Sequence, residues 1–144
     1  MKKLMLIILL VGTPLVAQEN RHEKIKALKR AHITETLSLS PSEAEKFWPV
    51  YNVYEDRMHT LKRSERKELG IFKDESLESM TDAEANTLID KIMELKSQEV
   101  QYRHELITDL RKVLPPKKII LLKKAEDDFK RQLLKQIRQR KGKK

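Results

Sequence analysis

Four histidines and a few neighbouring carboxylates are the side chains best suited to metal or acid–base chemistry. The histidines are His22, His32, His59 and His104. No two of them are three or four residues apart, the spacing that places two metal ligands on one helix face. The neighbouring carboxylates are Asp127 with Asp128 and Glu43 with Glu45. On a helix the members of each pair point in different directions. We therefore expect no metal site, no cofactor and no catalytic residue.

Aromatic residues gather around a single proline, Pro49. They are Phe47, Trp48, Tyr51 and Tyr54. One interpretation is a surface that receives a protein partner or an unfolded client. The other is a core, in which large side chains fill the space where a helix kinked at Pro49 crosses its neighbours. Their helical spacing favours the core.

The net charge of +9 belongs to the C-terminal end of the chain. From residue 115 onward there are twelve basic and three acidic side chains, whereas residues 18–114 are nearly balanced. The final ten residues hold six bases and no acid: Lys135, Arg138, Arg140, Lys141, Lys143 and Lys144. These bases either contact anionic lipid head groups or an acidic partner, or form a solvated tail whose cations suit a helix C-terminus.

The composition excludes several classes of enzyme. The chain has three glycines and no cysteine. Three glycines are too few for glycine-rich phosphate loops or for strained nucleophile elbows. Without cysteine, the chain can form no disulfide, thiolate nucleophile or cysteine-based metal site. We expect a protein that is not an enzyme.

The first residues have the pattern of a secretory signal peptide. Met1–Lys3 is a cationic start, Leu4–Val11 is an apolar run, and cleavage is expected between Ala17 and Gln18. A membrane anchor is the alternative, but the 14 residues from Leu4 to Ala17 are too short to cross a bilayer. We expect a periplasmic protein that does not meet nucleic acid.

The remaining sequence predicts an all-α fold, because apolar residues recur at helical spacing and never alternate with period two. We expect four long amphipathic helices, approximately over residues 21–37, 40–70, 81–114 and 116–137. Leu28 belongs to the apolar stripe of the first helix, and Pro49 should kink the second helix without ending it. Residues 71–80 form a connector whose Phe72 and Leu77 are expected to pack onto the helices.

Two capping boxes mark the starts of the second and third helices. Ser40 and Thr81 are hydroxyl caps, and Glu43 and Glu84 follow each of them three residues later. In this motif the hydroxyl accepts a hydrogen bond from the third backbone N–H, while the acid accepts one from the backbone of the cap. The spacing therefore gives strong helix starts.

The two boxes, the leader and the helical pattern together resemble the LTxxQ-motif periplasmic proteins of the Spy/CpxP type. Residues 46–51 (Lys-Phe-Trp-Pro-Val-Tyr) and 123–131 (Lys-Lys-Ala-Glu-Asp-Asp-Phe-Lys-Arg) most resemble exported Bacteroidetes proteins described as sensors of extracytoplasmic-function sigma factors. The chain departs from the Spy/CpxP motif in having Glu43 and Glu84 in place of glutamine and Met80 in place of leucine. The resemblance implies a cradle-shaped helical dimer that holds unfolded clients or reports envelope stress to a membrane-spanning regulator.

The sequence thus predicts a signal peptide (1–17), a helical domain (18–137) and a basic tail (138–144). Without the signal peptide only 44 of 127 residues, about 35%, are hydrophobic, which favours an open arrangement of helices and a homodimer over a closed monomeric bundle. The leading function is a sensor or adaptor with an envelope protein as partner. The alternatives are an ATP-independent chaperone for unfolded periplasmic clients and a peripheral envelope protein with a structural role.

Overall fold

The computed structural model describes residues 14–70 and 76–142, which form five helices and no strand. The helices are α1 (Pro14–Leu37), α2 (Pro41–Gly70), α3 (Ser76–Ser79), α4 (Asp82–Leu110) and α5 (Pro116–Lys141). The predicted all-α fold is confirmed, and α3 is one short turn within the predicted connector. In these two stretches no helix combines the length and apolar character needed to cross a membrane.

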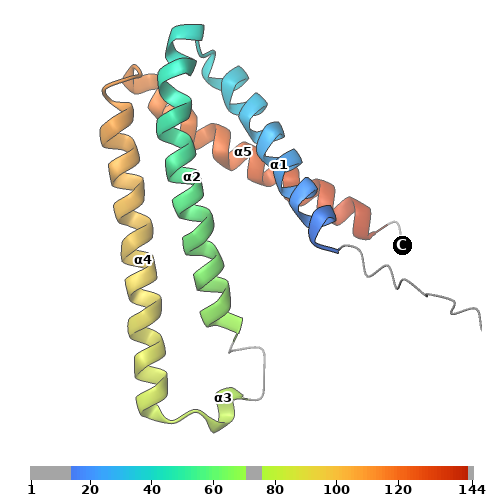
Figure 1. The fold of residues 1–144 in the computed structure, drawn as a ribbon, viewed down its shortest axis with the longest axis vertical. Coiled ribbons are helices and arrows are strands. Elements are labelled where there is room, and N and C mark those ends of the chain that lie inside the picture. Colours follow the sequence, from blue (N-terminus) through green and yellow to red (C-terminus); the bar gives the residue numbers. More distant parts are fainter. Residues whose placement is uncertain (1–13, 71–75, 143–144) are drawn as a thin grey trace, which may run out of the picture.

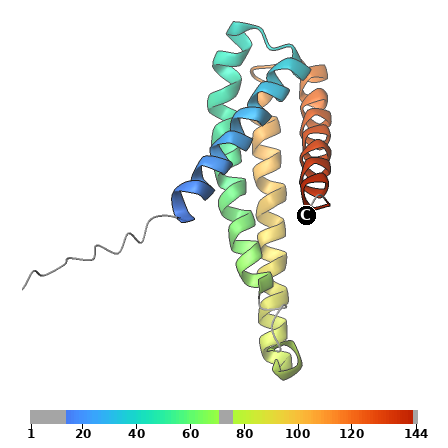
Figure 2. The ribbon, with the colours of Figure 1, turned by 90° about the vertical axis from the view of Figure 1, so that its right-hand side faces the viewer.

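The long helices form two pairs that meet at one end and diverge from it. Helix α2 packs against α4, and α1 packs against α5. Figure 1 shows α2 and α4 as a long antiparallel hairpin with α3 at its far tip, while α1 and α5 leave at an angle from the opposite end. In Figure 2 the first turns of α1 and the last turns of α5 also lie apart. The arrangement is therefore open on one side.

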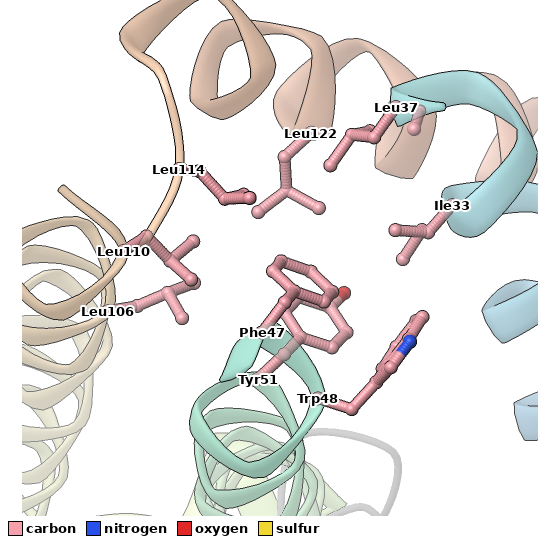
Figure 3. Packing of buried hydrophobic residues seen from close by; sticks show 10 residues of the cluster. Ile33, Leu37, Phe47, Trp48, Tyr51, Leu106, Leu110, Leu114 and Leu122 are labelled. Carbon is pink, nitrogen blue, oxygen red and sulfur yellow. The ribbon is translucent and has the colours of Figure 1, made fainter. Parts of the chain in front are cut away.

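The buried core lies where the two pairs meet, and we call this region the hub. Each long helix contributes the end that it brings to this junction. The hub residues are Ile33, Leu37, Phe47, Trp48, Tyr51, Leu106, Leu110, Leu114, Leu122 and Ala125. In Figure 3 the rings of Phe47 and Tyr51 lie together at the centre, with Leu106 and Leu110 of α4 on one side and Trp48 on the other, and Leu122 of α5 lies above them.

Helix α1 begins at Pro14 rather than at the predicted Arg21, and it runs through the expected cleavage point. A proline is well suited to the first turn because its missing N–H has no helical partner there. The helix ends in a Schellman motif, in which Leu39 N–H donates to the Thr34 carbonyl and Ser38 N–H to the Glu35 carbonyl. Ser38 has a φ of 47°, in the left-handed region that glycine usually occupies at this position.

The second helix has the predicted limits. Helix α2 continues through Pro49 to Gly70, so the proline does not end the helix.

Helix α4 ends at Leu110 instead of Leu114. The difference arises because Lys112 and Val113 bond to carbonyls three residues back, a tighter winding that precedes the prolines.

Two residues expected to pack onto the helices are exposed. Leu28 is 51% exposed and Leu77 is also 51% exposed. Leu28 precedes the part of α1 that reaches the hub, and Leu77 lies on α3 at the tip of the hairpin, so neither meets the core. Phe72 lies outside the described residues.

Candidate functional site

An open cleft of about 1010 Å³ lies beside the hub and is lined by all four long helices. Its apolar lining comes from six side chains: Ile25, Met58, Val100, Ile107, Phe129 and Leu133. The fold creates this interhelical cleft because α1 and α5 diverge from the α2–α4 hairpin just beyond the buried core. It therefore offers both apolar contacts and access for a large ligand.

The lining of the interhelical cleft also holds charged side chains, with more bases than acids. The basic residues are Lys26, Lys29, Lys62, Arg66, Lys96, Arg103, Lys123 and Lys130, and the acidic ones are Glu55, Asp56, Glu99, Glu126 and Asp127. Many of them are paired: Lys29 Nζ lies 2.6 Å from Glu55 Oε1, and Lys62 Nζ lies 2.8 Å from Glu99 Oε2. The excess positive charge favours an acidic ligand.

Glu126 of α5 is the centre of a polar network at the base of the cleft. Its carboxylate accepts a hydrogen bond from Tyr51 Oη at 2.8 Å and two from the Arg103 guanidinium, at 3.2 and 2.7 Å. Burial and the charge of Glu126 raise the pKa of Tyr51, so its hydroxyl stays protonated and donates. Burial alone would lower the pKa of Arg103, but the hydrogen bonds and charge of Glu126 raise it. The network joins α2, α4 and α5.

Both predicted capping boxes are present. Glu43 N–H donates to Ser40 Oγ at 3.1 Å while Ser40 N–H donates to Glu43, and Thr81 and Glu84 form the same pair of bonds. The first box has an additional role, because Lys118 Nζ lies 2.6 Å from Glu43 Oε2. It therefore ties the start of α2 to α5, whereas the second box caps α4 at the far tip of the hairpin.

The contact between Glu43 and Lys118 predicts that the protein loses stability in acid. The hydrogen bonds from Lys118 and from the Ser40 backbone hold the pKa of Glu43 below its ordinary 4.5. A carboxyl with a lowered folded-state pKa contributes stability above its unfolded pKa and loses it as the pH falls through the folded pKa. We expect the free energy of unfolding, measured by urea titration, to decrease as the pH falls below 4.5.

The matched variants for this prediction are Glu43→Gln and Glu45→Gln. Glu45 lies in the same turn, but its side chain has no ion pair or hydrogen bond within the described residues. Glu43→Gln should reduce the dependence on pH, and Glu45→Gln should leave it as in the parent chain. Equal slopes for Glu43→Gln and the parent would contradict the assignment.

The structure separates the four aromatic residues that could form a partner surface. Phe47 and Tyr51 are fully buried and Trp48 is 8% exposed, so these three belong to the hub. Tyr54 alone of the four lines the interhelical cleft. Burial of these three side chains agrees with the core interpretation, and Tyr54 is partly buried against the same cluster although it also lines the cleft.

The histidines are placed in a way that sequence spacing did not reveal. His22 of α1 and His59 of α2 have ring centroids 4.6 Å apart at the cleft. Even so, residues 14–70 and 76–142 contain no group of three or more histidine and acidic side chains that could hold a metal ion.

The side chains of Asp127 and Asp128 pair with Lys123 and Lys124, which hold both pKa values below the ordinary range.

The predicted basic residues lie at the end of α5. Lys135, Arg138, Arg140 and Lys141 are exposed, and α5 includes residues 138–141, which the sequence assigned to a tail. Lys143 and Lys144 lie outside the described residues. These bases are separate from the interhelical cleft.

Sequence reasoning missed the cleft and the network around Glu126. A signal in the sequence was Glu99, a charged residue that interrupts the apolar stripe of α4 and lines the cleft. Neither a scan against models of protein families nor searches of curated proteins and solved structures finds a match to this chain.

Proposed function

We propose that this chain is a non-enzymatic protein of the bacterial envelope that acts as a sensor or adaptor upstream of an extracytoplasmic-function sigma factor. In this role it is exported and cleaved near Ala17, and it holds a segment of a membrane-bound regulator. The signal-peptide pattern and the resemblance of residues 46–51 and 123–131 support the cellular setting. The interhelical cleft is the observation that carries the binding role.

The chemistry of the cleft suits a polypeptide segment that is both apolar and acidic. Val100 and Ile107 offer apolar contact, and the burial of such surface is the main favourable term in association. Arg66 and Lys130 have no ion pair among the described residues, so they are free to meet carboxylates of the segment. The regulator would be recognised through side chains rather than through a cofactor.

Cross-linking in living cells tests this role. A photo-activated amino acid is placed at Val100, which is 70% exposed in the cleft, or at Ile120, which is 74% exposed on another surface of α5. We expect one dominant adduct with an envelope protein from position 100 and none of the same mass from position 120. The same adduct from both positions, or none from position 100, would refute binding in the cleft.

A second candidate function is an ATP-independent chaperone that holds unfolded periplasmic clients. The observation that favours it is an exposed apolar stripe on α4, formed by Ile89, Met93 and Val100 at helical spacing. This stripe extends past the cleft toward the tip of the hairpin and could hold longer chains. Suppression of aggregation of several unrelated proteins at stoichiometric amounts would favour the chaperone over the adaptor.

The same exposed side chains lead us to propose a homodimer with a cradle-like shape. Ile89 and Met93 are 52% and 65% exposed, and a second copy would remove such surface from water. Sedimentation equilibrium should give a mass that rises with concentration to that of two chains. A constant mass near that of one chain would contradict the dimer.

A further inference from the structure

The end of α5 stands free of the rest of the described structure. Every residue from Leu134 to Gly142 is exposed. Figure 1 shows this end far from α2 and α4, and Figure 2 shows it apart from the first turns of α1. Most helices gain their stability by packing an apolar face against a neighbour. Within residues 14–70 and 76–142, these last turns therefore bury no side chain against a neighbouring helix.

This free end has the chemistry of an interfacial helix. Leu134 and Ile137 are 44% and 42% exposed, and with Leu133 they share one side of α5 at helical spacing. From Phe129 to Lys141 there are six bases and no acid. They are Lys130, Arg131, Lys135, Arg138, Arg140 and Lys141.

The last four of these bases are not neutralised by the protein itself. Within the described residues the ion pairs of α5 all lie between Lys118 and Arg131. Lys135, Arg138, Arg140 and Lys141 are therefore exposed without an ion-pair partner in the described structure. At this helix end the aliphatic side chains have no apolar surface to contact in the described structure, and the bases have no anionic group to contact there.

We propose that Arg131–Lys141 of α5 binds the surface of an anionic lipid bilayer, lying along it without crossing it. Leu134 and Ile137 enter the boundary between head groups and acyl chains, and the bases contact lipid phosphates. A bilayer supplies both partners at once and needs no shaped pocket, which suits a protruding helix better than it suits a groove for an acidic peptide. Leu133 of this segment also lines the interhelical cleft, whereas Leu134, Ile137 and the last four bases do not.

Vesicle sedimentation tests the proposal with the whole protein as purified from the cells that express it. The vesicles are phosphatidylcholine alone or phosphatidylcholine mixed with phosphatidylglycerol. One variant removes charge (Lys135→Gln, Arg138→Gln and Lys141→Gln), and another removes apolar contact (Leu134→Gln and Ile137→Gln). The matched control removes three bases elsewhere that are exposed and have no ion pair within the described residues (Arg63→Gln, Lys67→Gln and Arg111→Gln).

We expect the parent chain and the control to bind the anionic vesicles, and both α5 variants to bind at least about tenfold more weakly. Circular dichroism should show that all the variants remain folded, because every replaced side chain is exposed. In an Ile137→Trp variant, quenching by brominated lipid should place residue 137 within the bilayer boundary. Trp48 is buried in the hub and serves as an unquenched internal reference.

Three results would overturn the proposal. The first is an absence of binding to anionic vesicles by the parent chain. The second is equal weakening by the control and the charge variant, which would indicate nonspecific attraction to a basic protein. The third is lipid-free self-association that both α5 variants abolish while the tryptophan introduced at position 137 escapes quenching, which would assign this surface to a second copy of the chain.

Discussion

Replacing Phe47 by alanine is expected to lower the free energy of unfolding by about 4 kcal/mol. The side chain is fully buried, and its ring lies 4.8 Å from that of Trp48 and 5.2 Å from that of Tyr51, measured between centroids. The other hub side chains come from α1, α4 and α5, helices that several further contacts hold in place, so they cannot collapse fully into the cavity. Urea unfolding followed by circular dichroism and by the fluorescence of the single tryptophan measures the effect.

Two further variants keep this prediction open to refutation if Phe47→Ala fails to fold. Phe47→Leu retains most of the volume and should cost less than about 2 kcal/mol. Val53→Ala removes only the γ-methyl groups of a side chain that is 53% exposed on the same helix, and its effect should stay within about 0.5 kcal/mol. If Phe47→Ala were as mild as Val53→Ala, the aromatic cluster would not be the core of the protein.

Replacing Glu126 by glutamine is expected to lower the free energy of unfolding by about 2 kcal/mol. The change keeps the shape of the side chain but leaves the Arg103 guanidinium without an anion, where the two side chains are only 27% and 16% exposed. Breaking a largely buried ion pair costs more than an exposed pair contributes, because one charge stays in the protein without compensation. Urea unfolding again measures the loss.

The matched control is Glu105→Gln on the neighbouring helix. Glu105 lies 2.7 Å from Arg57, but the two side chains are 43% and 51% exposed, so the loss should be below about 0.5 kcal/mol. Adding Arg103→Met to Glu126→Gln should recover part of the stability, since the unpaired charge is then removed. Equal losses from the two glutamine variants would show that solvent screens the network as fully as the surface pair.

Much of the local structure follows from short stretches of sequence. Ser40 with Glu43 and Thr81 with Glu84 act within four residues, so each helix start could be predicted without knowledge of the rest of the fold. Leu88, Leu95, Leu106 and Leu110 keep one helical phase, and all four are buried. The end of α4 was misplaced because Pro115 limits where the helix must stop but not how tightly its last turn winds.

The relations between helices could not be predicted in the same way. An amphipathic stripe shows that a helix has a buried face, but it does not identify the helix that covers that face. The pairing of α1 with α5 therefore did not follow from the sequence, nor did the side-chain contacts between α2 and α5. Glu43 meets Lys118 and Tyr51 meets Glu126, and both pairs are separated by 75 residues.

The position of the hub at one end of the α2–α4 hairpin makes that hairpin a lever. Helix α4 has 29 residues, so its far tip lies about 40 Å from the junction. A rotation of about 6° at the junction would move the tip by about 4 Å over that length. A ligand that separated α5 from α4 near Glu126 and rotated the hairpin by this angle would thus move the far tip of the hairpin by several ångströms.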